Sequence, residues 1–183
     1  MKKRILLSIL VAFGLISSLN AYELNGDLGV KWTGFKLASK VGVSGTFNKI
    51  DLEITKSETL TEFLKSAKVK IESKSLESKD PVRNLNITST LFSLANTEFI
   101  KGSISSVDEI NKTLVLDVTM NKVTKTIPMN YEIENGNIIA KGSIDILDFD
   151  MKSSYLAFTQ KCSTLHENKS YSDVNIEFTI PFK

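Results

Sequence analysis

The sequence predicts an all-β, antiparallel fold flanked by a few short helices. Apolar and polar residues alternate with a period of two along most of the chain after Val30, as in strands with one buried face. Many of the links between these runs are shorter than the dozen or so residues that a parallel crossover requires. In addition, Asn135-Gly136 stands between two such runs, and this pair is the strongest short-range signal for a β-hairpin.

Residues 1–21 have the features of a bacterial secretory signal peptide. Lys2, Lys3 and Arg4 form a cationic start, residues 5–16 are almost all apolar, and Ala21 stands at the expected cleavage site. A retained membrane anchor is the alternative, but the apolar run is shorter than the roughly 20 residues that span a bilayer. The sequence therefore predicts a periplasmic protein of residues 22–183 with no stable membrane anchor after cleavage.

The strands are expected where the alternation is clearest. The runs cover residues 50–54, 68–72, 100–104, 114–118, 127–133, 138–146 and 174–182. Four consecutive strands between about Phe99 and Asp148 should form a meander, because only tight reversals separate them.

Helical signals interrupt the strands in three places. Thr59 to Glu62 has the spacing of a capping box, and Leu60, Phe63, Leu64 and Ala67 follow on one stripe. Asp80-Pro81 is an N-cap and N1 pair that opens a helix or turn, with less regular structure expected from Thr88 to Leu94. A longer helix is expected over residues 150–165, whose apolar face is Met151, Tyr155, Phe158, Cys162 and Leu165.

The charge of the mature chain disfavours nucleic acid as a partner. The full sequence has 23 basic and 21 acidic residues, and loss of the three cations of the leader leaves 20 against 21, a net charge of −1. The basic residues are interspersed with acidic ones and do not form the cationic face that phosphate binding requires.

The mature chain is expected to form one domain. No low-complexity stretch or Pro/Gly-rich linker divides it, and its single cysteine, Cys162, leaves packing alone to hold the fold. A homodimer is left open. Alternating strands of this number can close either as a two-sheet sandwich or as a barrel, and a barrel of about eight strands can hold one small ligand.

A resemblance to a known family, carried by several short segments, favours the barrel over the sandwich. They are Tyr22-Glu23-Leu24 at the first strand, Val43-Ser44-Gly45-Thr46-Phe47, Ser73-Lys74-Ser75-Leu76, Asp80-Pro81-Val82-Arg83-Asn84, Leu91-Phe92, Val123-Thr124-Lys125-Thr126-Ile127 and Ile146-Leu147-Asp148-Phe149. In order and spacing they resemble the YceI family of secreted, lipocalin-like proteins. The resemblance implies an extended antiparallel barrel of about eight strands whose apolar lumen binds a long isoprenoid or other amphipathic lipid.

The chain departs from the family pattern in ways that leave the head group of such a ligand open. Leu28-Gly29 stands where many members have His-Ser, and Thr126 replaces a proline. Residues 165–174 look like a subgroup feature. A polyprenyl quinone and a polyprenyl phosphate are both candidates for storage or transfer.

A lipid carrier needs a dry tunnel and no catalytic group or cofactor, because each methylene exposed to water costs about 0.8 kcal/mol. The candidate lining residues are Trp32, Phe47, Val69, Ile71, Leu114, Leu116, Val118, Met129, Tyr131, Ile144, Ile146 and Phe178. Each of them can equally be plain core. In that alternative the protein is a non-catalytic interaction or stress protein with a filled core, and its polar segments 75–96 and 165–173 bind the partner.

Enzymatic and metal-dependent functions find little support. The only histidine, His166, and Cys162 four residues before it are the one conceivable nucleophile and base pair, but a thiol within an apolar stripe is usually buried and protonated. Glu167 extends this set to three metal ligands, and no second cysteine or histidine completes a structural zinc site. Neither a catalytic nor a metal site is expected.

Asn111-Lys112-Thr113 is a candidate glycosylation site. It lies on an expected hairpin tip, and Glu109 precedes Asn111 by two positions, as some bacterial oligosaccharyltransferases favour. Asn86 and Asn168 stand in the same three-residue pattern without the acidic residue.

Overall fold

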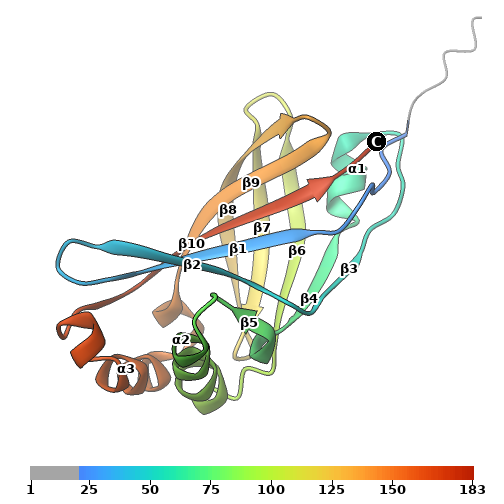
Figure 1. Ribbon diagram of the computed structural model, residues 1–183. Helices are drawn as coiled ribbons and strands as arrows, with labels where there is room; N and C mark the ends of the chain where they lie inside the picture. Colours follow the sequence, from blue (N-terminus) through green and yellow to red (C-terminus); the bar gives the residue numbers. More distant parts are fainter. Residues whose placement is uncertain (1–20) are drawn as a thin grey trace, which may run out of the picture.

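The computed structural model describes residues 21–183, so the expected signal peptide lies outside the described residues except for Ala21. The described chain forms one ten-stranded, antiparallel sheet that curls into a half-barrel (Figure 1). The sheet order is β3-β4-β6-β7-β8-β9-β10-β1-β2-β5. The strands are β1 (Gly29–Lys36), β2 (Val41–Phe47), β3 (Ile50–Glu53), β4 (Lys68–Glu72), β5 (Leu76–Glu77), β6 (Phe99–Asp108), β7 (Thr113–Met120), β8 (Val123–Glu134), β9 (Asn137–Asp145) and β10 (Ser170–Pro181).

Ten strands appear where about eight were expected because two chain segments bend. Only Asn48 and Lys49 separate β2 from β3, and only the turn Ser73–Ser75 separates β4 from β5. Backbone hydrogen bonds continue across both bends, from Asn48 N to the Ser75 oxygen at 2.9 Å and from Glu72 N to the Lys49 oxygen at 3.2 Å. The two edges of the sheet are therefore joined through these bent segments, and the predicted lipocalin-like barrel class is confirmed.

The predicted meander is confirmed as β6 to β9, in which each strand pairs with the next. Asn135 and Gly136, both with positive φ, form the tight turn between β8 and β9. At two strand ends the prediction was wrong. β9 ends at Asp145, and Ile146 begins a short 3-10 turn whose N-terminus is capped by the Asp145 carboxylate. β1 begins at Gly29, since Tyr22 and Leu24 form only isolated bridges with Ser57 and Phe182.

The helix α1 (Leu60–Lys65) closes one end of the half-barrel, which we call the α1 end (Figure 1). Its N-terminus is capped as predicted, with the Thr59 hydroxyl accepting a bond from Glu62 N at 3.2 Å. The Phe63 ring stacks near Tyr22, and the Tyr22 ring also contacts Phe182. These contacts bury the apolar face of α1 and seal this end.

Two further helices lie at the opposite end, which we call the helical end (Figure 1). The helix α2 (Pro81–Asn86) starts at the predicted N-cap, where Asp80 accepts bonds from the backbone of Val82 and Arg83, and it continues into a π-helical segment, Ile87–Phe92. Much of the segment expected to be a polar loop is thus helical.

The helix α3 (Lys152–Lys161) is shorter than the expected 150–165. It ends because the chain turns at Cys162, and a 3-10 turn, Thr164–His166, follows. Leu165 is consequently 56% exposed and does not belong to the buried stripe that the spacing predicted. Within residues 21–183 we find no helix with the length and apolar character needed to cross a membrane.

Candidate functional site

An apolar cavity of about 340 Å³ lies inside the half-barrel. It extends from Ala67, directly after α1, to Lys36 and His166 at the helical end. Its volume falls at the lower end of the range of known small-molecule sites, about 300–1,000 Å³. The cavity is therefore large enough for a ligand and is not a packing defect of one or two methyl groups.

Nine of the twelve candidate residues line this cavity. They are Trp32, Phe47, Val69, Ile71, Leu116, Val118, Ile144, Ile146 and Phe178. Most lie on the inward faces of paired strands: Leu116 is opposite Ile104, and Val118 is opposite Gly102, which also lines the cavity. Their contact with a ligand stays a prediction.

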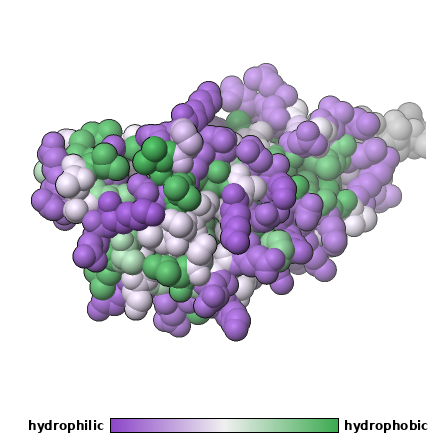
Figure 2. Space-filling view, turned by 60° about the horizontal axis from the view of Figure 1, so that its bottom comes forward, coloured by the Kyte–Doolittle hydropathy of each residue, from purple (hydrophilic) through white to green (hydrophobic). Residues whose placement is uncertain are grey.

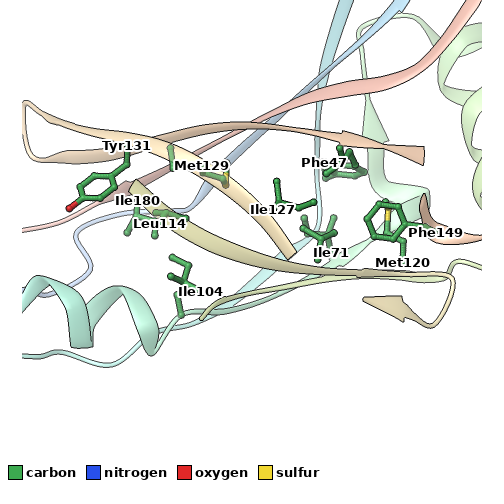
Figure 3. Close-up of a cluster of buried hydrophobic side chains, with 14 of the residues drawn as sticks. Phe47, Ile71, Ile104, Leu114, Met120, Ile127, Met129, Tyr131, Phe149 and Ile180 are labelled. Atoms are coloured by element: carbon green, nitrogen blue, oxygen red, sulfur yellow. The ribbon is translucent and has the colours of Figure 1, made fainter. Parts of the chain in front are cut away.

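Leu114, Met129 and Tyr131 do not line the cavity. They pack with one another toward the α1 end, where Figure 3 shows their side chains gathered close to Ile180. Leu114 and Met129 are each 2% exposed. The alternation of a strand gives these residues the same inward direction as the lining residues, but other side chains of the hydrophobic core, Ile180 among them, fill the space in front of them (Figure 3).

Trp32, the only tryptophan of the chain, packs closely against the backbone of Gly45 in the cavity wall. A Cβ on Gly45 would lie 2.5 Å from the Trp32 ring and 2.4 Å from the Glu77 oxygen. Without a side chain there, Trp32 lies against β2 and donates from Nε1 to the Thr46 oxygen at 3.3 Å. The glycine of the Val43–Phe47 segment therefore makes room both for the indole and for β5.

The cavity opens between helices and β1 at the helical end. We call Lys36, Asp80, Val82, Arg83, Leu165 and His166 the mouth residues, since all of them line the cavity at this end. Val82 is 59% exposed and Leu165 is 56% exposed, so the lining here reaches the solvent. Figure 2 turns this end forward and shows hydrophobic patches among hydrophilic residues.

Two of the charged mouth residues are held by hydrogen bonds. The Arg83 guanidinium lies 3.2 Å from an Asp80 oxygen and donates to the backbone oxygen of Ser78, also at 3.2 Å. Backbone donation from Arg83, followed by the nearby positive charges, lowers the pKa of Asp80 below its ordinary value, against the effect of burial. His166 Nδ1 lies 2.7 Å from the Ser170 hydroxyl.

The thiol and imidazole at this end are poorly suited to nucleophilic catalysis. Cys162 is buried and unpaired, as predicted, and burial raises the pKa of its thiol. Burial, with help from the charges of Lys36 and Arg83, lowers the pKa of His166. Both shifts oppose the thiolate and imidazolium pair that activates a cysteine nucleophile. Among residues 21–183, no three His, Cys, Asp or Glu side chains gather as a metal site.

Sequence reasoning missed the helical contribution to the cavity wall. Tyr155 and Phe158 of α3 and Ile87 and Leu91 of the π-helical segment all line it. The apolar spacing of α3 is visible in the sequence, but the twelve candidate lining residues do not include this face. Lys36 was also missed, although it continues the inward series of Val30, Trp32 and Gly34 at every second residue.

A curled antiparallel sheet around an apolar cavity, sealed at one end and open at the other, defines a lipocalin-like β protein. The chain belongs to the family of YceI-like domains, whose model matches residues 22–182.

Solved structures of similar fold agree with this membership. A polyisoprenoid-binding domain from Saccharophagus degradans, implicated in plant cell wall breakdown, aligns with a TM-score of 0.59 at 15% identity, covering 89% of this chain and 98% of its own. BcnA from Burkholderia cenocepacia aligns with a TM-score of 0.56 at 13% identity, covering 84% of this chain and 94% of its own. No curated protein sequence matches the chain.

Proposed function

We propose that this protein binds an amphipathic lipid with a long isoprenoid chain and stores or transfers it in the periplasm. The observation that supports this most is the apolar cavity of about 340 Å³, which a protein with a filled core would lack. The polyisoprenoid-binding domain of similar fold supports the ligand class. Export is supported by the cationic start and apolar run of residues 1–21.

The proposed role is binding without catalysis. An apolar chain gains about 0.8 kcal/mol for each methylene removed from water, so the cavity walls alone supply a large driving force. The mouth allows a polar head group to stay in contact with solvent. A carrier of this kind holds its cargo by burial, and release needs only a competing apolar phase such as a membrane.

The decisive experiment is to purify the exported protein from its own host and to identify lipid that co-extracts with it by mass spectrometry. A variant with a filled cavity serves as the control. Gly34 lines the cavity, and no atom lies within 4 Å of the position that a Cβ would take there, so Gly34→Phe places a ring in open space. Thr33→Phe puts the same ring on the outer face of β1.

We expect an isoprenoid lipid with the wild type and with Thr33→Phe, and a strongly reduced amount with folded Gly34→Phe. Absence of any lipid from the wild type, together with no binding of prenyl lipids by the purified protein, would disprove the proposal. The alternative of a plain interaction protein would then gain support.

A further inference from the structure

Lys36 is a charged residue on the inward face of β1. In the pairing with β2, Trp32 lies opposite Gly45, Gly34 opposite Val43 and Lys36 opposite Val41, so Lys36 has the same orientation as the cavity residues before it. It is partly buried and lines the cavity. Three other charged residues of the wall, Lys31, Lys101 and Glu177, occupy alternate, outward positions of their strands.

The charge of Lys36 is unmatched among the residues that the structure describes. Arg83 and Asp80 form an ion pair at 3.2 Å, whereas Lys36 forms neither an ion pair nor a side-chain hydrogen bond within residues 21–183. His166 contributes no charge at neutral pH, since burial first and the charges of Lys36 and Arg83 next lower its pKa. The four ionisable mouth residues thus have a net charge of +1, supplied by Lys36.

The effects of Lys36 on the pKa values of Asp80 and His166 agree with its location at the mouth. Its ammonium helps to lower the pKa of Asp80, after the larger effects of the Arg83 backbone and side chain, and that of His166, after burial. Asp80 caps α2, and His166 lies in the turn after α3. Lys36 is therefore near both helical elements that border the opening.

A partly buried ammonium beside an apolar cavity loses part of its hydration, and an anionic oxygen can compensate this loss. A ligand whose tail occupies the cavity would bring its head group to the mouth, where one anionic oxygen can accept a charge-assisted hydrogen bond. A neutral alcohol or quinone would leave the net positive charge of the mouth uncompensated.

We propose that Lys36 binds the anionic head group of the lipid, a phosphate or a carboxylate, so that the protein selects acidic lipids over neutral lipids with the same chain. The inference rests on the proposed function, since it requires a tail in the cavity. It names the class of ligand that the family membership leaves open.

The test compares two probes that differ only in the head group, geranylgeraniol and geranylgeranyl phosphate. Trp32 is the only tryptophan of the chain and lines the cavity, so its fluorescence reports occupancy directly. For the wild type we expect the phosphate to bind at least about tenfold more tightly, the size of one charge-assisted hydrogen bond. Lys36→Gln should remove this preference by weakening phosphate binding, so that the two probes bind with similar affinity.

Matched variants separate the head-group contact from general charge. Lys36→Arg should keep the preference. Lys31→Gln removes the same charge from the outer face of the same strand and should also keep it. Circular dichroism and thermal melting establish that each variant is folded.

Equal affinity of the wild type for the two probes, or an undiminished preference in folded Lys36→Gln, would overturn the inference and leave the proposed function intact. If neither probe binds, both the proposed lipid-binding function and the inference about Lys36 are wrong. Inorganic phosphate is the third ligand to be measured. If it competes with geranylgeranyl phosphate at equal concentration, the site is one for free anions and the lipid head-group assignment is wrong.

Discussion

At the level of single residues, burial changes the chemistry of Cys162 and His166. Cys162 is 2% exposed at the end of α3, and its side chain also borders the cavity. Its position is that of a small hydrophobic residue with a thiol that stays protonated. The residue is therefore part of the wall and no reactive centre.

Cys162→Ala tests this assignment. We expect a loss of about 1 kcal/mol in the free energy of unfolding, because the substitution leaves a small cavity, while lipid affinity is retained. Native Cys162 should react with iodoacetamide far more slowly than the thiol of the denatured chain, because its pKa is raised by burial. Rapid alkylation of the folded protein would show that the thiol is accessible and would contradict the assignment.

His166 should make stability depend on pH in a defined window. Its pKa in the folded protein is lowered from the ordinary 6.5, first by burial and then by Lys36 and Arg83. The unfolded chain therefore binds a proton more readily, and the free energy of unfolding should fall as the pH drops from about 6.5 toward the folded pKa. Chemical denaturation of wild type and His166→Gln between pH 7.5 and 5.5, a range set around the ordinary histidine pKa of about 6.5, measures this.

In His166→Gln this part of the pH dependence should disappear. The carboxylates with lowered pKa, such as Asp80 and Asp108, titrate in a more acidic range and serve as an internal control in both proteins. An equal loss of stability in wild type and variant over the histidine window would show that another group is responsible.

At the level of elements, β7 combines two kinds of inward position. Leu114 and Leu116 are two residues apart on the same face, but Leu114 is 2% exposed and packed at the α1 end, whereas Leu116 borders the cavity. One strand thus provides core at one end and cavity wall at the other. Leu114 and Leu116 differ because core side chains pack against the first, whereas the cavity lies beside the second.

The pair Leu114→Ala and Leu116→Ala separates these two roles. Leu114→Ala should lower the free energy of unfolding by about 2–5 kcal/mol, the usual cost of emptying a packed site. Leu116→Ala should cost less, because its side chain already borders empty space, and should change lipid affinity. Thermal melting and Trp32 fluorescence titration measure the two effects.

Thr119→Lys, on the outer face of β7, is the control and should change neither property. If Leu116→Ala destabilises as strongly as Leu114→Ala and leaves lipid binding unchanged, then Leu116 is core and does not contact the ligand.

At the level of the whole molecule, the cavity links stability to occupancy. A ligand that binds only the folded state stabilises it by about 2.7 kcal/mol at a free concentration one hundred times its Kd. For a chain of this length each kcal/mol raises the Tm by roughly 2–4 °C. We expect saturating prenyl lipid to raise the Tm of the delipidated protein by roughly 5–10 °C, and differential scanning calorimetry measures this shift.

The same lipid should leave the Tm of Gly34→Phe unchanged, since the added ring occupies the cavity. That variant, without ligand, should melt no lower than the delipidated wild type if its ring fills empty space as designed. A lipid-dependent rise of equal size in both proteins would place the binding surface outside the cavity.

Local features of the fold were readable from the sequence because they depend on neighbouring residues. The meander β6 to β9, the Asn135-Gly136 turn and the caps at Thr59 and Asp80 each follow from alternation, backbone freedom or a side chain within a few positions. Most of the inward face of the candidate cavity was identified for the same reason, since a strand has only two faces.

Only the tertiary structure decided whether an inward-facing strand residue packs in the core or lines the cavity. Leu114, Met129 and Tyr131 have the same pattern as the lining residues, but they are buried in the hydrophobic core and do not border the cavity. The bends that turn eight segments into ten strands, the early end of α3 and the position of Lys36 beside α2 also depend on contacts between distant segments. A period of two specifies which face of the sheet a side chain lies on. Whether that face meets packed core or a cavity depends on residues that are distant in the sequence.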